Sequence, residues 1–276
     1  MAAKSPLINV MERAARKAGR GLVRDFGEVE QLQVSPKGPG DFVSTADLRS
    51  EKLLKEELGR ARPDFGFLME ESGETPGRDE THRWIVDPLD GTVNFLHGIP
   101  HFCISIAVEQ VSLSAGRARH DIIAGLVYNP LTDESYWADK NQGAYLNDRR
   151  MRVSGRRRLD ESLIAVGLPG IGDENHQPAL ARIGALMAKT GGVRRFGCAA
   201  LDLAFVAAGR YEGYWQESLG PWDLAAGLIL VREAGGFACT LGGGDDILGT
   251  GSVIAGNDSI HGALRDILEA EEHAAS

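Results

Sequence analysis

The segment Trp84–Thr92 constrains the fold most, because a short apolar strand runs directly into two aspartates. Its first three residues, Trp-Ile-Val, predict a buried strand that ends at Asp87. The proline that follows prevents a regular continuation of the strand, and the glycine near the end permits a tight turn. This arrangement predicts that Asp87 and Asp90 point toward one place, with the carbonyl of Leu89 between them.

Acidic residues stand at four places where the pattern predicts the end of a strand or the start of a helix. They are Asp41 with Asp47, Glu70 with Glu71, Asp87 with Asp90, and Asp223. Several carboxylates that converge repel one another and need cations to be stable. An all-oxygen set favours Mg²⁺, and two such ions about 4 Å apart can clamp the attacking and leaving oxygens of a phosphoryl group. Backbone N–H groups at Gly91 and Thr92, where a helix could begin, favour a phosphate.

Simpler interpretations exist for each of these groups taken alone. Asp-Pro and Asp-Gly are common in turns, and a pair of glutamates is usually solvated. A strand that leads into an Asp-rich turn ending in Asp-Gly-Thr is also typical of haloacid-dehalogenase-type phosphatases, whose two aspartates are two positions apart. Here Asp87 and Asp90 are three apart and Leu89 occupies the middle position. A covalent aspartyl-phosphate mechanism would therefore lack its second carboxylate.

The composition narrows the class of protein. The 276 residues are 43% hydrophobic and 25% charged, which is typical of a folded globular chain. No window approaches the roughly 18 consecutive apolar residues of a membrane span, and the N-terminus lacks a secretory pattern, so we expect no membrane association. Three widely spaced cysteines predict a reducing, cytoplasmic location. The net charge of −9 argues against a protein whose main task is binding nucleic acid.

The remaining pattern predicts helices and strands that both alternate and cluster, so α/β or α+β layers are expected. Helices are predicted over 7–26 and, after a cap at Thr45 or Asp47, over a segment that carries Leu54 and Leu58. The other expected segments are a loop at 35–40, strands at 65–68, 84–86, 101–110, 122–128, 135–138, 163–166, 211–215 and 252–255, and helices at 178–188, 199–208, 221–234 and 260–271. The helix at 178–188 should turn Leu180, Ile183 and Met187 inward.

Taken together, the acidic motifs resemble the inositol monophosphatase family. The resemblance runs from the first helix to about Asn257, almost the whole chain. It rests on Asp41-x-Val43-x-x-x-Asp47, Glu70-Glu71-Ser72, Trp84-Ile85-Val86-Asp87-Pro88-Leu89-Asp90-Gly91-Thr92-Val93-Asn94-Phe95 and Trp222-Asp223-Leu224-Ala225-Ala226-Gly227. It implies an α+β fold, a layered α-β-α-β-α sandwich, with residues 1–276 as one domain. A soft boundary near 150 would separate a metal-site half from a substrate-side half.

The resemblance also implies a phosphoric monoester hydrolase that uses two or three Mg²⁺ ions, is lithium-sensitive and is usually a homodimer. The first metal would be held by Glu70, Asp87, Thr92 and the Leu89 carbonyl, and the second by Asp87, Asp90 and Asp223. Glu70, and a third and weaker ion, would organise the attacking water. Asp47, hydrogen-bonded to Thr92, would draw a proton from that metal-activated water, so that no phosphoenzyme forms. Contacts to a small phosphorylated metabolite would come from Asp90, Gly91, Thr92, Gly197, Ala199, Gln216 and Asp223.

One departure from the family pattern concerns the substrate. Many members carry a Glu seven residues before the last aspartate, where it binds a sugar or inositol hydroxyl. That position is Gln216 here, which lacks the charge, and Glu217 could replace it only if the loop register shifts. Inositol 1-phosphate is the default substrate. Fructose 1,6-bisphosphate, histidinol phosphate and 3′-phosphoadenosine 5′-phosphate are the alternatives.

The resemblance also leaves a second function open, because some bacterial members of the family bind the transcription machinery. An arginine run could serve such an interface, although basic runs are more often solvated loops. The run comprises Arg149, Arg150, Arg152, Arg156, Arg157 and Arg158. A non-enzymatic partner role, including a nucleic-acid or transcription partner, is therefore the alternative to catalysis.

Overall fold

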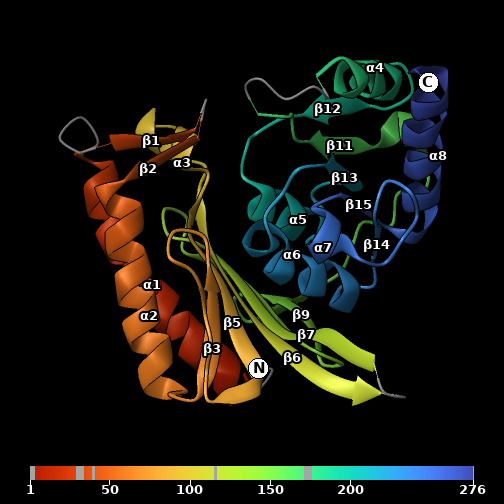
Figure 1. Ribbon diagram of the computed structural model, residues 1–276. Helices are drawn as coiled ribbons and strands as arrows, with labels where there is room; N and C mark the ends of the chain where they lie inside the picture. The colour runs from red at the N-terminus through yellow and green to blue at the C-terminus, as the bar shows by residue number, and fades with distance from the viewer. Residues whose placement is uncertain (1–3, 29–33, 39–40, 115–116, 171–175, 276) are drawn as a thin grey trace.

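Helices and sheets alternate in five layers in the computed structural model (Figure 1), which describes residues 4–28, 34–38, 41–114, 117–170 and 176–275. The layers are α1 and α2, a first sheet, α5 and α6, a second sheet, and α4 with α8. The expected α+β fold with α-β-α-β-α layers is confirmed. Among the described residues, no helix is long and apolar enough to cross a membrane.

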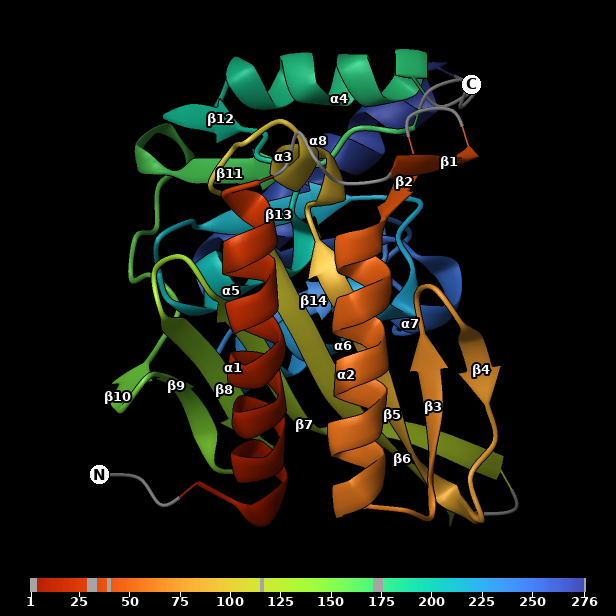
Figure 2. The same cartoon turned by 90° about the vertical axis from the view of Figure 1, so that its left-hand side faces the viewer.

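The first sheet has eight strands, and Figure 2 shows α1 (Pro6–Phe26) and α2 (Thr45–Ala61) lying across one of its faces. In order across the sheet the strands are β10 (Arg149–Met151), β9 (Gly143–Leu146), β8 (Glu134–Asp139), β7 (Arg117–Asn129), β6 (Cys103–Ser114), β5 (Asp79–Asp90), β3 (Phe65–Met69) and β4 (Gly73–Thr75). β3 and β5 are parallel neighbours, whereas β5 and β6 are antiparallel. The C-terminal ends of β3 and β5 therefore lie at the same edge of the sheet.

The second sheet has five strands. They are, in order, β12 (Gly192–Arg194), β11 (Leu163–Val166), β13 (Gly213–Gln216), β15 (Val253–Gly256) and β14 (Phe237–Cys239). Between the sheets lie α5 (Ala199–Ala207) and α6 (Pro221–Glu233), and the outer face carries α4 (His176–Met187) and α8 (Asp258–Ala275). One hydrophobic cluster joins both sheets to α5 and α6, so the two halves of the chain share a core.

The central strand β5 is buried on both faces, which explains its unbroken apolar sequence. Trp84 and Val86 pack in the cluster beneath α1 and α2, and Ile85 points into the cluster around α5 and α6. Successive residues of a strand face opposite sides, so both faces of such a strand must be apolar. This double burial fixes the position of the residues at the end of β5.

Helix α1 has the predicted features of an amphipathic surface helix. Ser5 caps its first turn by accepting a hydrogen bond from the N–H of Ile8, and Pro6 occupies the first helical position. The apolar stripe is buried at Met11, Ala14, Ala18 and Leu22. The stripe anchors the helix layer to the sheet.

Three expectations were wrong. Helix α2 is capped by Ser44, whose side chain accepts the N–H of Ala46, and not by Thr45 or Asp47, which lie within the helix. The predicted loop at 35–40 contains β1 (Val34–Gly38), which pairs with β2 (Asp41–Ser44) in a two-stranded ribbon. Pro36 is compatible with it because each strand of such a ribbon has an unpaired side. Residues 39–40 lie outside the described part of the chain.

The third error concerns the inward face of α4. Ile183 packs half-buried against the outer hydrophobic cluster, as predicted. Leu180 and Met187, however, are 54% and 66% exposed, and the buried positions are Ala179, Arg182 and Leu186. Arg182 occupies the inner face because its guanidinium finds partners there, donating to the Leu268 carbonyl and to Glu217. A buried arginine of this kind breaks the apolar pattern on which the prediction rested.

Candidate active site

The end of β5 forms the centre of the site. Its pairing with β6 is regular as far as Asp87 and shifts before Asp90, so the strand bends where the two aspartates occur. Gly91 follows with φ of 89°, and a Cβ there would lie 2.9 Å from the carbonyl oxygen of His101. Only glycine fits this turn. Helix α3 (Thr92–Leu96) then begins at Thr92, as predicted.

Three predicted metal ligands converge at this point. Carboxylate oxygens of Asp87, Asp90 and Asp223 lie within 4.8 Å of one another. Asp223 comes from the first turn of α6, where its Oδ2 accepts the N–H of Gly220 at 2.7 Å and caps the helix. Asp87 and Asp90 are buried, whereas Asp223 is partly exposed.

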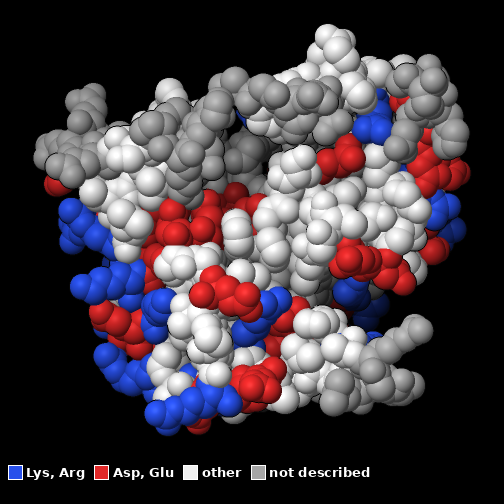
Figure 3. Space-filling view, viewed as in Figure 1, with Lys and Arg blue, Asp and Glu red and all other residues white. Residues whose placement is uncertain are grey.

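Glu70 joins the group from the neighbouring strand. It follows β3 directly, and its N–H donates to the carbonyl of Val86 on β5 at 3.2 Å. Its side chain is close enough to Asp87 to raise the pKa of that aspartate. Figure 3 shows acidic side chains gathered along the hollow between the α1–α2 side of the molecule and the side that holds the second sheet.

The proximity and burial of these carboxylates raise their pKa values. Burial, reinforced by the charges of Glu70, Asp90 and Asp223, raises the pKa of Asp87 well above its usual range. Burial raises the pKa of Asp90 to about 6, and burial together with Asp90 raises the pKa of Asp223 to about 8. Carboxylates arranged in this way favour a bound proton or a bound cation.

Thr92 links the metal-site residues to Asp47. Its hydroxyl lies 3.1 Å from Asp47 Oδ1 and 2.9 Å from the carbonyl oxygen of Leu89, and it can donate its single proton to either. The Leu89 N–H in turn donates to Asp87 Oδ1 at 2.9 Å. Asp47 is fully buried, and burial raises its pKa despite the hydrogen bonds from Ser44 and Thr92.

The predicted substrate-side residues of the second half lie at two different places in the structure. Gly197, with φ of 72°, and Ala199 lie at the start of α5, next to Ala200, whose N–H donates to Asp90 Oδ2 at 2.7 Å. Gln216 lies farther along, at the end of β13, where its Oε1 accepts the hydroxyl of Tyr214 at 2.5 Å.

The neighbour Glu217, which the sequence offered as a substitute for the usual Glu, is directed elsewhere. Its Oε2 accepts a hydrogen bond from Arg182 at 3.0 Å. The side chain of Gln216 instead packs so closely against Gly167 that any Cβ there would overlap it. Gln216 is therefore held in one orientation by its surroundings.

Sequence reasoning missed several residues that position the site. Glu51 is buried and accepts the N–H of Glu71 at 2.9 Å, which fixes the loop that carries Glu70. Asn94 donates to the carbonyls of His101 and Phe196, which ties α3 to the start of α5. Glu51 could have been found from the sequence, because it lies one helical turn after Asp47 and so on the same face of the predicted helix. The partners of Asn94 could not, because no sequence pattern indicates them. The side chain of Asp41 lies outside the described part of the structure.

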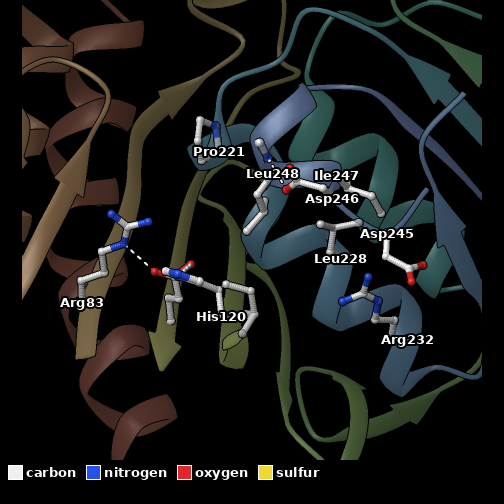
Figure 4. A pocket seen from close by; sticks show the side chains of 12 residues that line it. Arg83, His120, Pro221, Leu228, Arg232, Asp245, Asp246, Ile247 and Leu248 are labelled. Carbon is white, nitrogen blue, oxygen red and sulfur yellow. Dashed lines mark hydrogen bonds and ion pairs between the residues drawn. The ribbon is translucent and has the colours of Figure 1, made fainter. Parts of the chain in front are cut away.

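A cavity of about 370 Å³ lies elsewhere and does not contain the acidic cluster. Figure 4 shows it between the strands that carry Arg83 and His120 and the helix that carries Arg232. On this wall Glu109 Oε2 accepts a hydrogen bond from Arg83 Nε at 2.6 Å. The cavity is lined by both basic and acidic residues, and nothing in this lining indicates that it shares the metal-binding chemistry of the acidic cluster.

Comparison with known proteins identifies the family to which the chain belongs. The profile of the inositol monophosphatase family matches residues 3–273. An inositol-1-monophosphatase of Mesorhizobium japonicum is 55% identical over 262 residues, or 95% of this chain and 96% of the relative. Nus factor SuhB of Escherichia coli K12 is 39% identical over 259 residues, or 94% of each chain. The crystal structure of the extragenic suppressor protein suhB from Bartonella henselae superposes with a TM-score of 0.90 at 54% identity, covering 96% of this chain and 98% of that one.

The chain belongs to the inositol monophosphatase family, and the resemblance seen in the motifs is confirmed. The family defines a class of phosphoric monoester hydrolases, in which we place this protein.

Proposed function

We propose that the protein hydrolyses inositol 1-phosphate to inositol and phosphate, with Mg²⁺ as its cofactor. The observation that carries the proposal is the convergence of Asp87, Asp90 and Asp223 beside the Thr92–Asp47 pair. The intact acidic cluster argues for catalysis rather than a purely structural role, because uncompensated buried carboxylates destabilise a fold.

The donor set fits Mg²⁺. The candidate ligands are the carboxylates of Glu70, Asp87, Asp90 and Asp223, together with the Leu89 carbonyl and the Thr92 hydroxyl. All are oxygen donors, which a hard cation prefers. When bound, two or three Mg²⁺ ions supply positive charge that activates water and stabilises the leaving oxygen.

The residues of the chain supply the proton path. Thr92 can donate its proton to Asp47, which leaves the hydroxyl oxygen free to accept a proton from the attacking water. Asp47 is suited to hold that proton, because burial raises its pKa. Glu70 would orient the water, and the N–H groups of Gly91 and Thr92 would hold the phosphate. No step requires a phosphorylated residue.

Substrate recognition would depend on the second half of the chain. The small residues Gly197 and Ala199 leave room near Asp90 for the leaving group. Because Gln216 Oε1 is engaged by Tyr214, the amide N–H₂ is the part of Gln216 that can face a ligand. An amide donor suits the oxygen of an inositol or sugar hydroxyl. Inositol 1-phosphate ranks first because relatives named inositol-1-monophosphatase are 55% and 51% identical to this chain.

The experiment that tests the substrate is phosphate release, with and without Mg²⁺, from four compounds. They are inositol 1-phosphate, fructose 1,6-bisphosphate, histidinol phosphate and 3′-phosphoadenosine 5′-phosphate. We expect the highest kcat/KM for inositol 1-phosphate. Preference for another compound would overturn the substrate, and no release from any compound would overturn the activity.

A partner role in transcription is a second proposal, favoured by the 39% identity to a protein named Nus factor SuhB and by the arginine run. The run is exposed, although Arg156 pairs with the buried Glu212 at 2.9 Å. Replacement of Arg149 and Arg157 by Ser spares that pair and should reduce capture of transcription proteins from a lysate. Unchanged capture would remove the motivation for this role.

Family membership is the support for three further proposals: a homodimer, inhibition by Li⁺ and a cytoplasmic location. Gel filtration with light scattering measures the first, and phosphate release at increasing LiCl with constant ionic strength measures the second. A monomeric enzyme would contradict the homodimer, and equal inhibition by LiCl and KCl would contradict specific inhibition by Li⁺. Cell fractionation measures the location.

A further inference from the structure

Two cysteines lie side by side next to Asp90, although they are far apart in the sequence. Cys103 begins β6 and Cys198 directly precedes α5, and their Sγ atoms are 3.6 Å apart. Asp90 Oδ2 lies 3.1 Å from the Sγ of Cys198 and 3.9 Å from the Sγ of Cys103. All three side chains are buried.

These separations match the edges of a metal-centred tetrahedron. Zn–S bonds of about 2.3 Å and a Zn–O bond of about 2.0 Å place two sulfurs about 3.8 Å apart and a sulfur and an oxygen about 3.5 Å apart. The observed Sγ–Sγ distance is 3.6 Å, and the two Sγ–oxygen distances, 3.1 and 3.9 Å, lie on either side of the ideal value. Small side-chain movements would therefore bring all three atoms onto one cation.

A second buried carboxylate stands close to this group. Asp202 lies one helical turn after Cys198, is 1% exposed, and has an Oδ1 with no hydrogen-bond partner among the described residues. Burial raises the pKa of Asp202 well above its usual range, and the charge of Asp90 adds to the effect. An unpartnered buried carboxylate oxygen is unfavourable, and a cation beside Asp90 would reduce that penalty.

The donors distinguish this group from the all-oxygen cluster. Thiolates select soft or borderline cations such as Zn²⁺ and Cd²⁺, whereas Mg²⁺ prefers carboxylates. A thiol becomes a metal ligand by losing its proton, so a thiophilic ion must displace the protons of these two buried thiols when it binds.

We propose that Cys103, Cys198 and Asp90 form a binding site for one thiophilic divalent cation, and that its occupancy inhibits the enzyme. On binding, each thiol releases its proton to solvent and forms a sulfur–metal bond, with no change in oxidation state. Inhibition follows because Asp90 belongs to both groups, so the soft cation withdraws a carboxylate from the Mg²⁺ ligands. The binding site stands on its own geometry, and only the inhibition rests on the proposed function.

The binding test is a Cd²⁺ titration of the purified protein in excess Mg²⁺ and a phosphine reductant, followed by the ultraviolet charge-transfer band of cadmium thiolate. The wild type should show the band and bind one equivalent. Cys103→Ser and Cys198→Ser should each weaken binding at least about tenfold. Cys239→Ser is the matched control, because this third buried thiol lies on β14 beside His261, and it should keep the band.

Some results would overturn the site. They are a wild type without the band, or a band that persists in Cys198→Ser and disappears in Cys239→Ser. Thermal unfolding of each variant without Cd²⁺ checks that it is folded, and Cys198→Ala replaces Cys198→Ser if the latter is not. This test does not use catalysis, so it decides the site whether or not the protein is a phosphatase.

The inhibition test is phosphate release at increasing Cd²⁺, with each variant compared with its own uninhibited rate. The wild type and Cys239→Ser should be inhibited alike. Cys103→Ser and Cys198→Ser should require at least about tenfold more Cd²⁺ for the same inhibition. Equal inhibition of all four proteins would place the inhibitory ion among the oxygen ligands and overturn the role of the thiols.

Discussion

The hydroxyl of Thr92 lies 3.1 Å from the carboxylate of Asp47, which joins two residues that are 45 positions apart. Asp47 has a second role, because its other oxygen accepts the N–H of Ser44 at 2.9 Å and completes a capping box at the start of α2. One buried carboxylate thus holds a helix in place and stands ready to receive a proton through Thr92. The two roles can be separated by mutation.

Asp47→Asn should lower kcat by about 10²- to 10⁴-fold, the range expected for loss of a general base. Ser44→Ala removes the cap side chain but leaves the Thr92–Asp47 bond. It should lower the free energy of unfolding by about 1 kcal/mol and change kcat only a few-fold. Kinetics and denaturant unfolding of both variants measure this. Equal losses of kcat would mean that Asp47 acts only by holding α2.

The acidic cluster should make the stability of the metal-free protein fall as the pH rises. Asp90 and Asp223 have folded-state pKa values of about 6 and about 8, above the unfolded value of roughly 3.9. The folded state then binds protons more tightly, so this contribution is complete below pH 4 and is lost as the pH rises through 6 to 8. Melting temperatures in EDTA should fall over that range more steeply than in Mg²⁺. Parallel curves with and without Mg²⁺ would contradict this.

Gln216→Ala should raise KM for inositol 1-phosphate about 5- to 10-fold, as expected for loss of a hydrogen bond of about 1–1.5 kcal/mol. Hydrolysis of p-nitrophenyl phosphate, which lacks ring hydroxyls, should be unchanged. Tyr214→Phe frees Gln216 Oε1 while keeping the amide, and it should have the smaller effect on KM. Identical KM values for Gln216→Ala and wild type would remove Gln216 from the substrate site.

The packing of α6 against the first sheet can be tested at a single glycine. A Cβ at Gly125 on β7 would lie 2.5 Å from Ile229 Cγ2 and 3.0 Å from the Cα of Ala226. Gly125→Ala should therefore destabilise the protein by about 1–3 kcal/mol. Gly184→Ala on α4 is the control, because a Cβ there meets no atom of the described residues within 4 Å. This substitution should stabilise the exposed helix by about 0.4–1 kcal/mol. Denaturant unfolding should give opposite signs, and a destabilising Gly184→Ala would contradict this account of packing.

The strongest parts of the fold and site could be predicted because their signals are local. Buried stretches such as Trp84–Val86 and the stripe of α1 depend on nearest neighbours along the chain. Asp87 and Asp90 follow from a single strand and its turn. The capping position of Asp223 follows from Pro221 and the apolar helix behind it.

The rest depends on contacts between distant segments. Short edge strands such as β4 and β10 have three residues each and carry too little pattern to be recognised. The prediction of the inward face of α4 failed because the buried Arg182 is stabilised by Leu268 and Glu217, which lie 86 and 35 positions away in the sequence. The bond from Ala200 to Asp90 spans 110 positions and has no local signature.

Mg²⁺-dependent phosphate release from inositol 1-phosphate by the wild type and by Asp90→Asn tests the central claim most directly. The wild type should release phosphate only with Mg²⁺, and Asp90→Asn should be slower by at least about 10²-fold, comparable to loss of one electrostatic contact in the transition state. Asp90→Asn should remain folded in EDTA, because it removes one charge from a repelling group and keeps an oxygen for the Ala200 N–H. Equal rates for the two proteins, or release that is independent of Mg²⁺, would contradict the account.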